Sequence, residues 1–217
     1  MHALKMAVFD FDGTLVDSVP AIARGIQLAN EEIGIAPVSY ETAKSIIGLG
    51  FKDIIPIVAP DLPESEYGRY KDIYVRYFLQ SDPSLKLFPG VLELLRELQD
   101  AGIKTAIATG KSRKGLSRIV NRMNVWDYFD DSITADEALP KPDPLMLNTL
   151  FERNGLTMDE IVMIGDTEHD IKLGKAAGVR TIAVTWGAAP IERLEAYKPD
   201  AIVRTMEALK TKLDELA

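Results

Sequence analysis

From residue 87 to the C-terminus, short apolar runs of strand length alternate with segments whose apolar residues have helical spacing. The runs Ile103–Ala108 and Ile161–Ile164 are typical of buried strands, and residues 91–98 have helical spacing before Gly102, a residue type that often ends a helix. This alternation predicts an α/β fold, with a Rossmann-like parallel sheet core and helices on both faces. The other elements expected here are helices over 112–124 and 145–154, a helix ending at Gly178, strands over 181–184 and 201–203, and a closing helix over 206–216.

An acid pair follows the first expected strand, Met6–Phe9, without any intervening residue. Asp10 and Asp12 are two residues apart, so in extended backbone their side chains project to the same side. Gly13 allows a sharp turn, and the Thr14 hydroxyl is expected to bond nearby backbone amides. Carboxylates held this close repel each other unless a proton or a cation lies between them. The pair therefore suggests a magnesium and phosphate site.

Three further polar sites lie along the chain in the same kind of context. Thr109 and Gly110 directly follow one apolar strand, and Asp166 lies at the end of another, with Asp170 one helical turn later. Lys141 lies between two prolines, each of which restricts the backbone. Ligands of open α/β sheets bind outside the carboxyl ends of the strands. We therefore expect these side chains to meet at one edge of the sheet.

Residues 19–82 interrupt the alternation, because they show helical spacing and no strand pattern. The acid pairs on either side of this segment must belong to one body, so the core must be discontinuous. We expect a catalytic core of residues 1–18 and 83–217, with an all-helical insertion of residues 19–82 after the first strand. The helices expected in the insertion span residues 20–33, 40–47, 51–58 and 64–79.

Taken together, the four sites resemble a known family. The segment Asp10–Ser18 (DFDGTLVDS), Thr109, Lys141 and the segment Gly165–Asp170 are similar, in this order, to the four motifs of the haloacid dehalogenase (HAD) superfamily, on its phosphatase branch. The resemblance covers nearly the whole chain, and the phosphoglycolate phosphatase-like group is the nearest. It implies that the insertion is the helical cap of this superfamily.

The resemblance also implies an enzyme and a mechanism. Asp10 would be the nucleophile that forms an aspartyl-phosphate, and Asp12 the general acid and base. The implied function is Mg²⁺-dependent hydrolysis of a small phosphate monoester, phosphoglycolate-like or a sugar phosphate. Two alternatives stay open: a sugar phosphomutase on the same scaffold, and a receiver-type phospho-acceptor module.

The implied ligand set for Mg²⁺ consists of oxygen atoms, which this ion prefers. The side chains of Asp10 and Asp166 and the backbone carbonyl of Asp12 would bind it. Asp170 would support the site by orienting Lys141 or a metal-bound water. The phosphoryl oxygens would be held by Thr109, Gly110 and Lys141.

A glycine-flanked bend between two expected helices of the insertion could reach the site. Gly48 and Gly50 resemble the cap loop that faces the core in the phosphoglycolate phosphatase-like group. Lys52 or Arg24 would then recognise an anionic end of the substrate. The alternative is a simple turn between helices with a surface lysine.

Two other features invite a functional interpretation that we reject. Gly110, Lys111 and Ser112 look like the end of a phosphate-binding Walker A loop, but that motif requires glycine where Thr105 stands. Lys111 and Ser112 are instead expected to begin a helix, since serine is a good N-cap. For His169 we expect a surface or supporting role rather than metal binding.

The composition of the chain limits the classes of binding partner that we expect. The chain has a net charge of −8 and no cysteine, and no apolar run of membrane-spanning length. An acidic surface disfavours nucleic acid and anionic membranes, and the missing cysteines exclude thiolate chemistry. We therefore expect a cytoplasmic monomer or homodimer that acts on a small phosphorylated metabolite, without nucleic acid or membrane partners.

Overall fold

Six parallel strands form the sheet of this computed structural model, which describes residues 3–217. The strands are β1 (Met6–Phe9), β2 (Lys104–Thr109), β3 (Asp131–Thr134), β4 (Ile161–Gly165), β5 (Arg180–Val184) and β6 (Ala201–Val203). Their order in the sheet is β3-β2-β1-β4-β5-β6. Phe9 of β1 pairs with Ile107 on one side and Ile164 on the other, so β2, β1 and β4 end at the same level. This is the Rossmann strand order, in which the ligand crevice lies where the order reverses.

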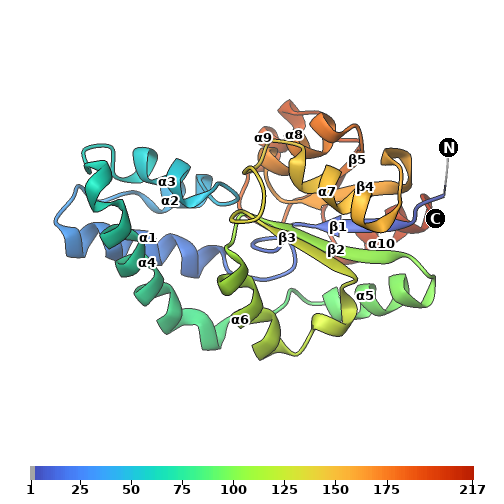
Figure 1. Ribbon diagram of the computed structural model, residues 1–217, viewed down its shortest axis with the longest axis horizontal. Helices are drawn as coiled ribbons and strands as arrows, with labels where there is room; N and C mark the ends of the chain where they lie inside the picture. The colour runs from blue at the N-terminus through green and yellow to red at the C-terminus, as the bar shows by residue number, and fades with distance from the viewer. Residues whose placement is uncertain (1–2) are drawn as a thin grey trace.

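Helices cover both faces of the sheet, as Figure 1 shows. Side chains of a strand point alternately to opposite faces, so Ala7 and Phe9 pack in one core and Met6 and Val8 in another. The first core also holds buried residues of α5 (Val91–Asp100), α6 (Arg113–Met123) and α10 (Met206–Asp214). The second holds buried residues of α7 (Leu145–Asn154) and α8 (Glu168–Ala177). The short α9 (Ile191–Ala196) packs beside α8 through Leu194.

The segment between β1 and α5 forms a helical cap at the opposite end of the molecule from the two termini (Figure 1). Its helices are α1 (Val19–Ile33), α2 (Tyr40–Ser45), α3 (Phe51–Val58) and α4 (Tyr67–Ser81). Asn30 of α1 is fully buried and connects these pieces. Its amide donates to the Val58 carbonyl at 2.7 Å and to the Ala36 carbonyl at 3.1 Å, and its oxygen accepts from the Tyr70 hydroxyl at 2.6 Å.

The two crossings between core and cap run beside each other. The Phe88 amide donates to the Leu15 carbonyl at 2.9 Å, and the Asp17 amide donates to the Lys86 carbonyl at 3.0 Å. At the end of α4, the buried Asp82 carboxylate lies 3.2 Å from Nε of Arg118 on α6. The second crossing is therefore fixed to the core by an ion pair as well.

The α/β fold with an all-helical cap after the first strand is confirmed, with differences in detail. The helix expected over 64–79 spans Tyr67–Ser81, and the closing helix ends at Asp214 rather than at residue 216. Strand β3 and helix α9 were not predicted, and α2 ends at Ser45 rather than at residue 47. In β3 only Ile133 is strongly apolar, so the local pattern is weak. Its pairing with β2 and its packing under α7, rather than its own sequence, make it a strand.

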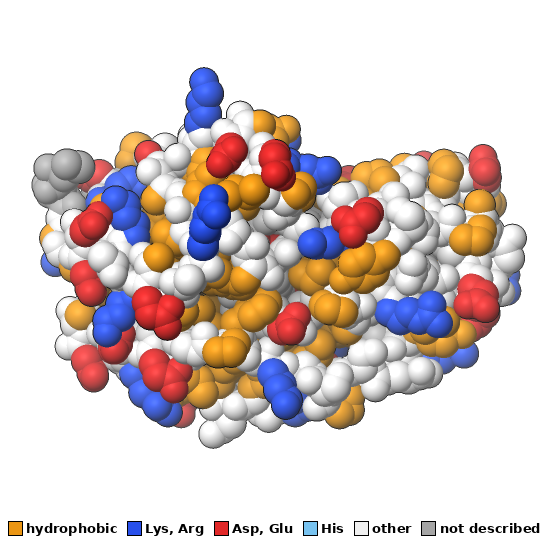
Figure 2. Space-filling view, turned by 180° about the vertical axis from the view of Figure 1, so that it is seen from behind, with side chains coloured by type: hydrophobic (Ala, Val, Ile, Leu, Met, Phe, Trp, Pro, Cys, Tyr) orange, Lys and Arg blue, Asp and Glu red, His pale blue; other side chains and the backbone are white. Residues whose placement is uncertain are grey.

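Charged side chains of both signs are interspersed over the face shown in Figure 2. Hydrophobic side chains also reach the surface there, over the core and over the cap. Among the helices of residues 3–217, none is both long and apolar enough to cross a membrane.

Candidate active site

The predicted acids lie together at the carboxyl end of the sheet. Asp10 follows β1 and Asp166 follows β4, two strands that pair side by side, and Thr109 ends β2 on the other side of β1. Asp170 lies in the first turn of α8, and Lys141 lies in the loop between β3 and α7. All five side chains are buried, with at most 3% of each residue exposed. The fold thus gathers groups that are far apart in the sequence.

Lys141 connects two of the carboxylates. Its Nζ lies 2.9 Å from Oδ1 of Asp10 and 2.6 Å from Oδ1 of Asp170. The second oxygen of Asp170 accepts from the amide and the hydroxyl of Thr167, at 3.0 and 2.8 Å, in a capping box that begins α8. Asp170 therefore holds Lys141 in place while its other oxygen is already engaged by the helix.

Asp166 is held by hydrogen bonds on both oxygens. Thr14 donates its hydroxyl to Oδ1 at 2.9 Å, and the Ala188 amide donates to Oδ2 at 2.6 Å. The expectation that Thr14 bonds nearby backbone amides is thus wrong, because its hydroxyl is used by an acid 152 positions away. Two glycines, Gly13 and Gly187, leave space for the Asp166 side chain, because a Cβ at either position would clash with it. Gly13 also needs its freedom for the turn, at φ +79°.

Replacing Gly187 with alanine is expected to disturb this site. The new Cβ would lie 2.1 Å from Oδ2 of Asp166, whose side chain cannot shift without losing its two hydrogen bonds. Overpacking of this kind costs about 1–3 kcal/mol, so a lower melting temperature and a lower turnover are expected. The matched control is Gly68→Ala on α4, where a Cβ meets no atom within 4 Å and should stabilise the helix. Equal melting temperatures for both variants would contradict the packing argument.

Asp12 is also held on both oxygens. The Ser18 hydroxyl donates to Oδ1 at 2.5 Å, and Nζ of Lys111 lies 2.9 Å from Oδ2. Ser112 is the N-cap of α6, as expected, and accepts from the Gly115 amide at 3.3 Å. Lys111, however, stands before the helix rather than in it, and its side chain turns to the acid.

The cap loop lies directly on the residues expected to bind phosphate. A Cβ added to Gly110 would lie 3.0 Å from the Gly48 carbonyl oxygen and 3.1 Å from that of Leu49. A Cβ on Gly48 would lie 3.1 Å from Oγ1 of Thr167, and one on Gly50 would lie 3.4 Å from Pro140. The bend therefore covers the loops that follow β2 and β4 and the loop that carries Lys141.

Lys52, in the first turn of α3, is exposed. A cavity of about 530 Å³ opens nearby, between the cap and the loop of Lys141. Leu49 and Asp53 line it from the cap, and residues 139–143 line it from the core. Because Lys141 belongs to this lining, the cavity leads toward the acid cluster.

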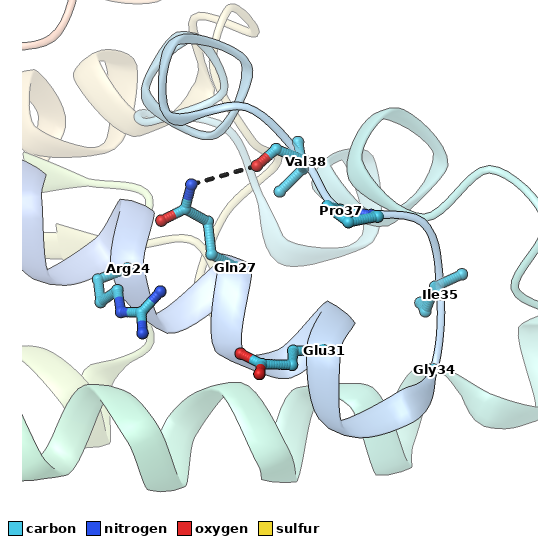
Figure 3. Close-up of a pocket in the computed structure, with 7 residues that line it drawn as sticks. All are labelled: Arg24, Gln27, Glu31, Gly34, Ile35, Pro37 and Val38. Carbon is cyan, nitrogen blue, oxygen red and sulfur yellow. Dashed lines mark hydrogen bonds between the residues drawn. The ribbon is translucent and has the colours of Figure 1, made fainter.

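Arg24 lies away from the acids. It lines a second cavity of about 480 Å³ whose walls are formed by residues of the cap alone, as Figure 3 shows. There the Gln27 amide donates to the Val38 carbonyl at 3.2 Å. His169 lies closer, since a Cβ on Gly48 would come within 3.8 Å of its ring, and burial lowers its pKa.

The donor set fits a divalent cation. Asp10, Asp166 and Asp170 each offer a carboxylate oxygen, and these oxygens lie within 4.8 Å of one another. Among residues 3–217, no group donates a hydrogen bond to the buried Oδ2 of Asp10. Burial raises the pKa of Asp10 to about 7 against the opposing effect of Lys141, and burial together with Asp10 raises that of Asp166 well above its usual range. One lysine leaves the three acids with an excess of negative charge, which a divalent cation would balance.

Several residues that build this site were not predicted. Thr14, Ser18, Thr167 and Ala188 hold the acids, and Lys111 contacts Asp12. Lys111 could have been found, because it directly follows the expected phosphate residues at a strand end. The amide of Ala188 carries no sequence signal, since every residue except proline has one.

Comparison with known proteins identifies the family of this chain. The family model described as haloacid dehalogenase-like hydrolase matches residues 7–184. A phosphoglycolate phosphatase of Vibrio parahaemolyticus is 32% identical over 95% of this chain and 94% of its own length.

Two solved structures agree over almost the whole fold. A predicted phosphoglycolate phosphatase from Haemophilus somnus superimposes with a TM-score of 0.88 at 25% identity, covering 98% of this chain and 99% of the other. A putative β-phosphoglucomutase from Bacteroides vulgatus gives 0.86 at 25% identity, covering 99% and 89%. The chain therefore belongs to the haloacid dehalogenase-like hydrolase family, as an enzyme of its phosphoglycolate phosphatase-like group.

Proposed function

We propose that this enzyme is a Mg²⁺-dependent phosphatase that hydrolyses a small phosphate monoester, phosphoglycolate-like or a sugar phosphate. The observation that carries the proposal is the cluster of Asp10, Asp166 and Asp170, whose carboxylate oxygens lie within 4.8 Å of one another, with Lys141 in contact with Asp10 and Asp170. The similarity to phosphatases over nearly the whole chain supports it.

Asp10 is the proposed nucleophile. Its Oδ1 is held by Lys141 at 2.9 Å, while Oδ2 is buried and free of any hydrogen bond within residues 3–217. The carboxylate of Asp10 is the group that would attack phosphorus. The attack forms an aspartyl-phosphate and divides a difficult hydrolysis into two easier steps. Lys141, the Thr109 hydroxyl and the Gly110 amide hold the phosphoryl oxygens.

Asp12 is the proposed general acid and base. It gives a proton to the leaving oxygen, and it then takes one from the water that cleaves the aspartyl-phosphate. Ser18 and Lys111 fix its carboxylate at 2.5 and 2.9 Å. This geometry supports a defined position for the proton transfer, two residues along the chain from the nucleophile.

The proposed Mg²⁺ ligands are the side chains of Asp10 and Asp166 and the backbone carbonyl of Asp12. Asp170 supports the site by holding Lys141 at 2.6 Å. When bound, the ion neutralises negative charge on the phosphoryl group. The cap, proposed to span residues 19–82 over a core of 1–18 and 83–217, excludes water through its loop at Gly48 and Gly50.

Removing the metal should stop the reaction. With p-nitrophenyl phosphate as substrate, we expect turnover in Mg²⁺ to fall about 100-fold or more in excess EDTA, since a Lewis acid contributes several kcal/mol. Added Mg²⁺ should restore it. Phosphate release that is unchanged in EDTA would contradict the metal dependence, whereas no release from any ester would contradict the phosphatase.

A phosphomutase is the second candidate, favoured by the similarity to the putative β-phosphoglucomutase. It would need a bisphosphate and would release no net phosphate, so the same assay separates the two. A receiver-type module is disfavoured, because receivers have the strand order 2-1-3-4-5, whereas this sheet has the order β3-β2-β1-β4-β5-β6.

A further inference from the structure

Trp186 is a residue to which the proposed reaction gives no role. It lies in the loop after β5, at the carboxyl end of the sheet, and its indole Nε1 donates to the backbone carbonyl of Thr14 at 3.1 Å. Thr14 lies in the turn after β1, 172 positions earlier in the chain. In the sheet, β4 separates β1 from β5. The hydrogen bond therefore spans the end of β4, and the residue that follows β4 is Asp166, a proposed Mg²⁺ ligand.

Both segments that this hydrogen bond joins also hold Asp166. The Thr14 hydroxyl donates to Oδ1 of Asp166 at 2.9 Å. The Ala188 amide, two residues after Trp186, donates to Oδ2 at 2.6 Å, and the Ala189 amide donates to the Asp166 carbonyl at 3.3 Å. The indole hydrogen bond therefore closes a ring of contacts that passes through this carboxylate.

The indole ring is itself held in position. It is half-buried and packs against the first core. Its centre lies 6.3 Å from that of the Phe88 ring, at an interplanar angle of 62°, which is the edge-to-face arrangement that aromatic pairs favour. The Phe88 amide donates to the carbonyl of Leu15, the residue after Thr14. The turn after β1 is thus fixed by Trp186 and by the neighbour on which Trp186 packs.

The position of the Thr14 hydroxyl matters for a carboxylate that binds a metal. A group that hydrogen-bonds to a ligating side chain orients it, and the loss of such a partner typically lowers metal affinity about 10- to 100-fold. Thr14 is such a partner of Asp166, and it is buried, with 1% of the residue exposed. Its hydroxyl can stay within hydrogen-bond distance only while the turn that carries it stays in place. The N–H of Trp186 fixes this turn from a distant segment.

We infer that Trp186 is a positioning residue for the metal site: its N–H holds the turn of Thr14, and through the Thr14 hydroxyl it orients Asp166 for Mg²⁺. The inference rests on the proposed Mg²⁺ site and adds to it a residue outside the four motif segments. Trp186 acts through Thr14, so its removal should lower the affinity for the ion and leave the reacting groups, Asp10 and Asp12, intact.

The test is a calorimetric titration of the protein with Mg²⁺ alone. Trp186→Phe keeps an aromatic ring but has no N–H, and its Kd for Mg²⁺ should rise about 10-fold, the lower end of the range for outer partners of a metal ligand. With p-nitrophenyl phosphate, its kcat at saturating Mg²⁺ should stay close to that of wild type. The matched control is Trp126→Phe, at the other tryptophan of the chain, which precedes β3 at the amino end of the sheet. Its Kd should equal that of wild type.

A double-mutant cycle tests the path through Thr14. Thr14→Val removes the hydroxyl at nearly constant shape, so it should raise the Kd for Mg²⁺ by itself. In that background, Trp186→Phe should add less than about a twofold change, because the group through which it acts is already absent.

A second measurement keeps Trp186 in place. In Trp126→Phe, Trp186 is the one tryptophan left, so Mg²⁺ should change its fluorescence in a saturable way, and Asp166→Asn should abolish this response.

Three results would overturn the inference: an unchanged Kd in Trp186→Phe, effects of Trp186→Phe and Thr14→Val that multiply fully, or a Trp186 fluorescence that does not respond to bound Mg²⁺. In each of these cases wild type still binds the ion, so the proposed function survives. A wild type that binds no Mg²⁺ in the calorimeter would instead contradict the proposed cofactor, and this role with it.

Discussion

Replacing Asp10 with asparagine is expected to lower kcat about 10⁴-fold, the scale found when a group that acts on the reacting atoms is removed. The amide oxygen is a poor nucleophile and cannot form the aspartyl-phosphate. The asparagine side chain has nearly the same shape as that of aspartate, so the loss of turnover can be assigned to the chemical step. Phosphate release from p-nitrophenyl phosphate measures it. Asp17→Asn, an exposed acid of the same segment, is the control and should retain wild-type turnover.

The same substitution has an opposite expected effect on stability. Burial raises the pKa of Asp10 from 3.8 to about 7, so between these values the folded protein binds more protons than the unfolded chain. The free energy of unfolding of metal-free wild type therefore falls as the pH rises through this window. Asparagine does not titrate. In EDTA, the melting temperature of Asp10→Asn relative to wild type should thus increase from pH 5 to pH 8.

A variant that keeps wild-type turnover would contradict the role of Asp10 as nucleophile. A melting difference that is independent of pH would contradict the buried, charge-crowded setting of its carboxylate. The two results are separate, because the first concerns the reaction and the second concerns the folded state alone.

Replacing Lys141 with methionine is expected to cause the largest loss of stability. Its ammonium is fully buried between Asp10 and Asp170, at 2.9 and 2.6 Å. Methionine fills similar space but leaves buried carboxylates without their cation. Breaking a buried ion pair in this way costs about 3–5 kcal/mol. Urea unfolding in metal-free buffer near pH 7 measures it, and kcat in Mg²⁺ should fall about 10³-fold because a donor to the phosphoryl group is lost.

Lys104→Met is the matched control for that experiment. Lys104 is exposed and donates to Asn154 at 3.0 Å on the surface, so its loss should change the free energy of unfolding by no more than about 0.5 kcal/mol. Similar unfolding curves for both lysine variants would show that Lys141 does not balance the buried acids.

Much of the fold could be predicted from local pattern. The apolar runs that became β1, β2, β4 and β5 are long enough to be recognised, and a parallel sheet then follows from the helices between them. Strand β3 was missed because its residues, Asp131 to Thr134, are mostly polar, and it is a strand through its pairing with β2. Helix α9 has six residues, too few for a clear helical repeat.

In the candidate site too, some features follow from the local sequence pattern and others do not. Asp10, Thr109 and Asp166 stand at strand ends, so their neighbourhood follows once the sheet is assumed. The partners of Asp166 could not be predicted in this way. Thr14 and the Ala188 amide reach it from positions 152 and 22 residues away, and no local pattern encodes either contact.

By itself, the sequence determined the α/β core, the helical cap after β1 and the order of chemical groups along the chain, because periodicity and turn residues act over short distances. Tertiary structure alone decided how these groups are paired. It turned Lys111 toward Asp12, gave Asp10 and Asp170 a shared lysine, and set the cap loop on Gly110. Such contacts depend on the distances between elements that meet only after the chain has folded, and burial then fixes the charge that each group can carry.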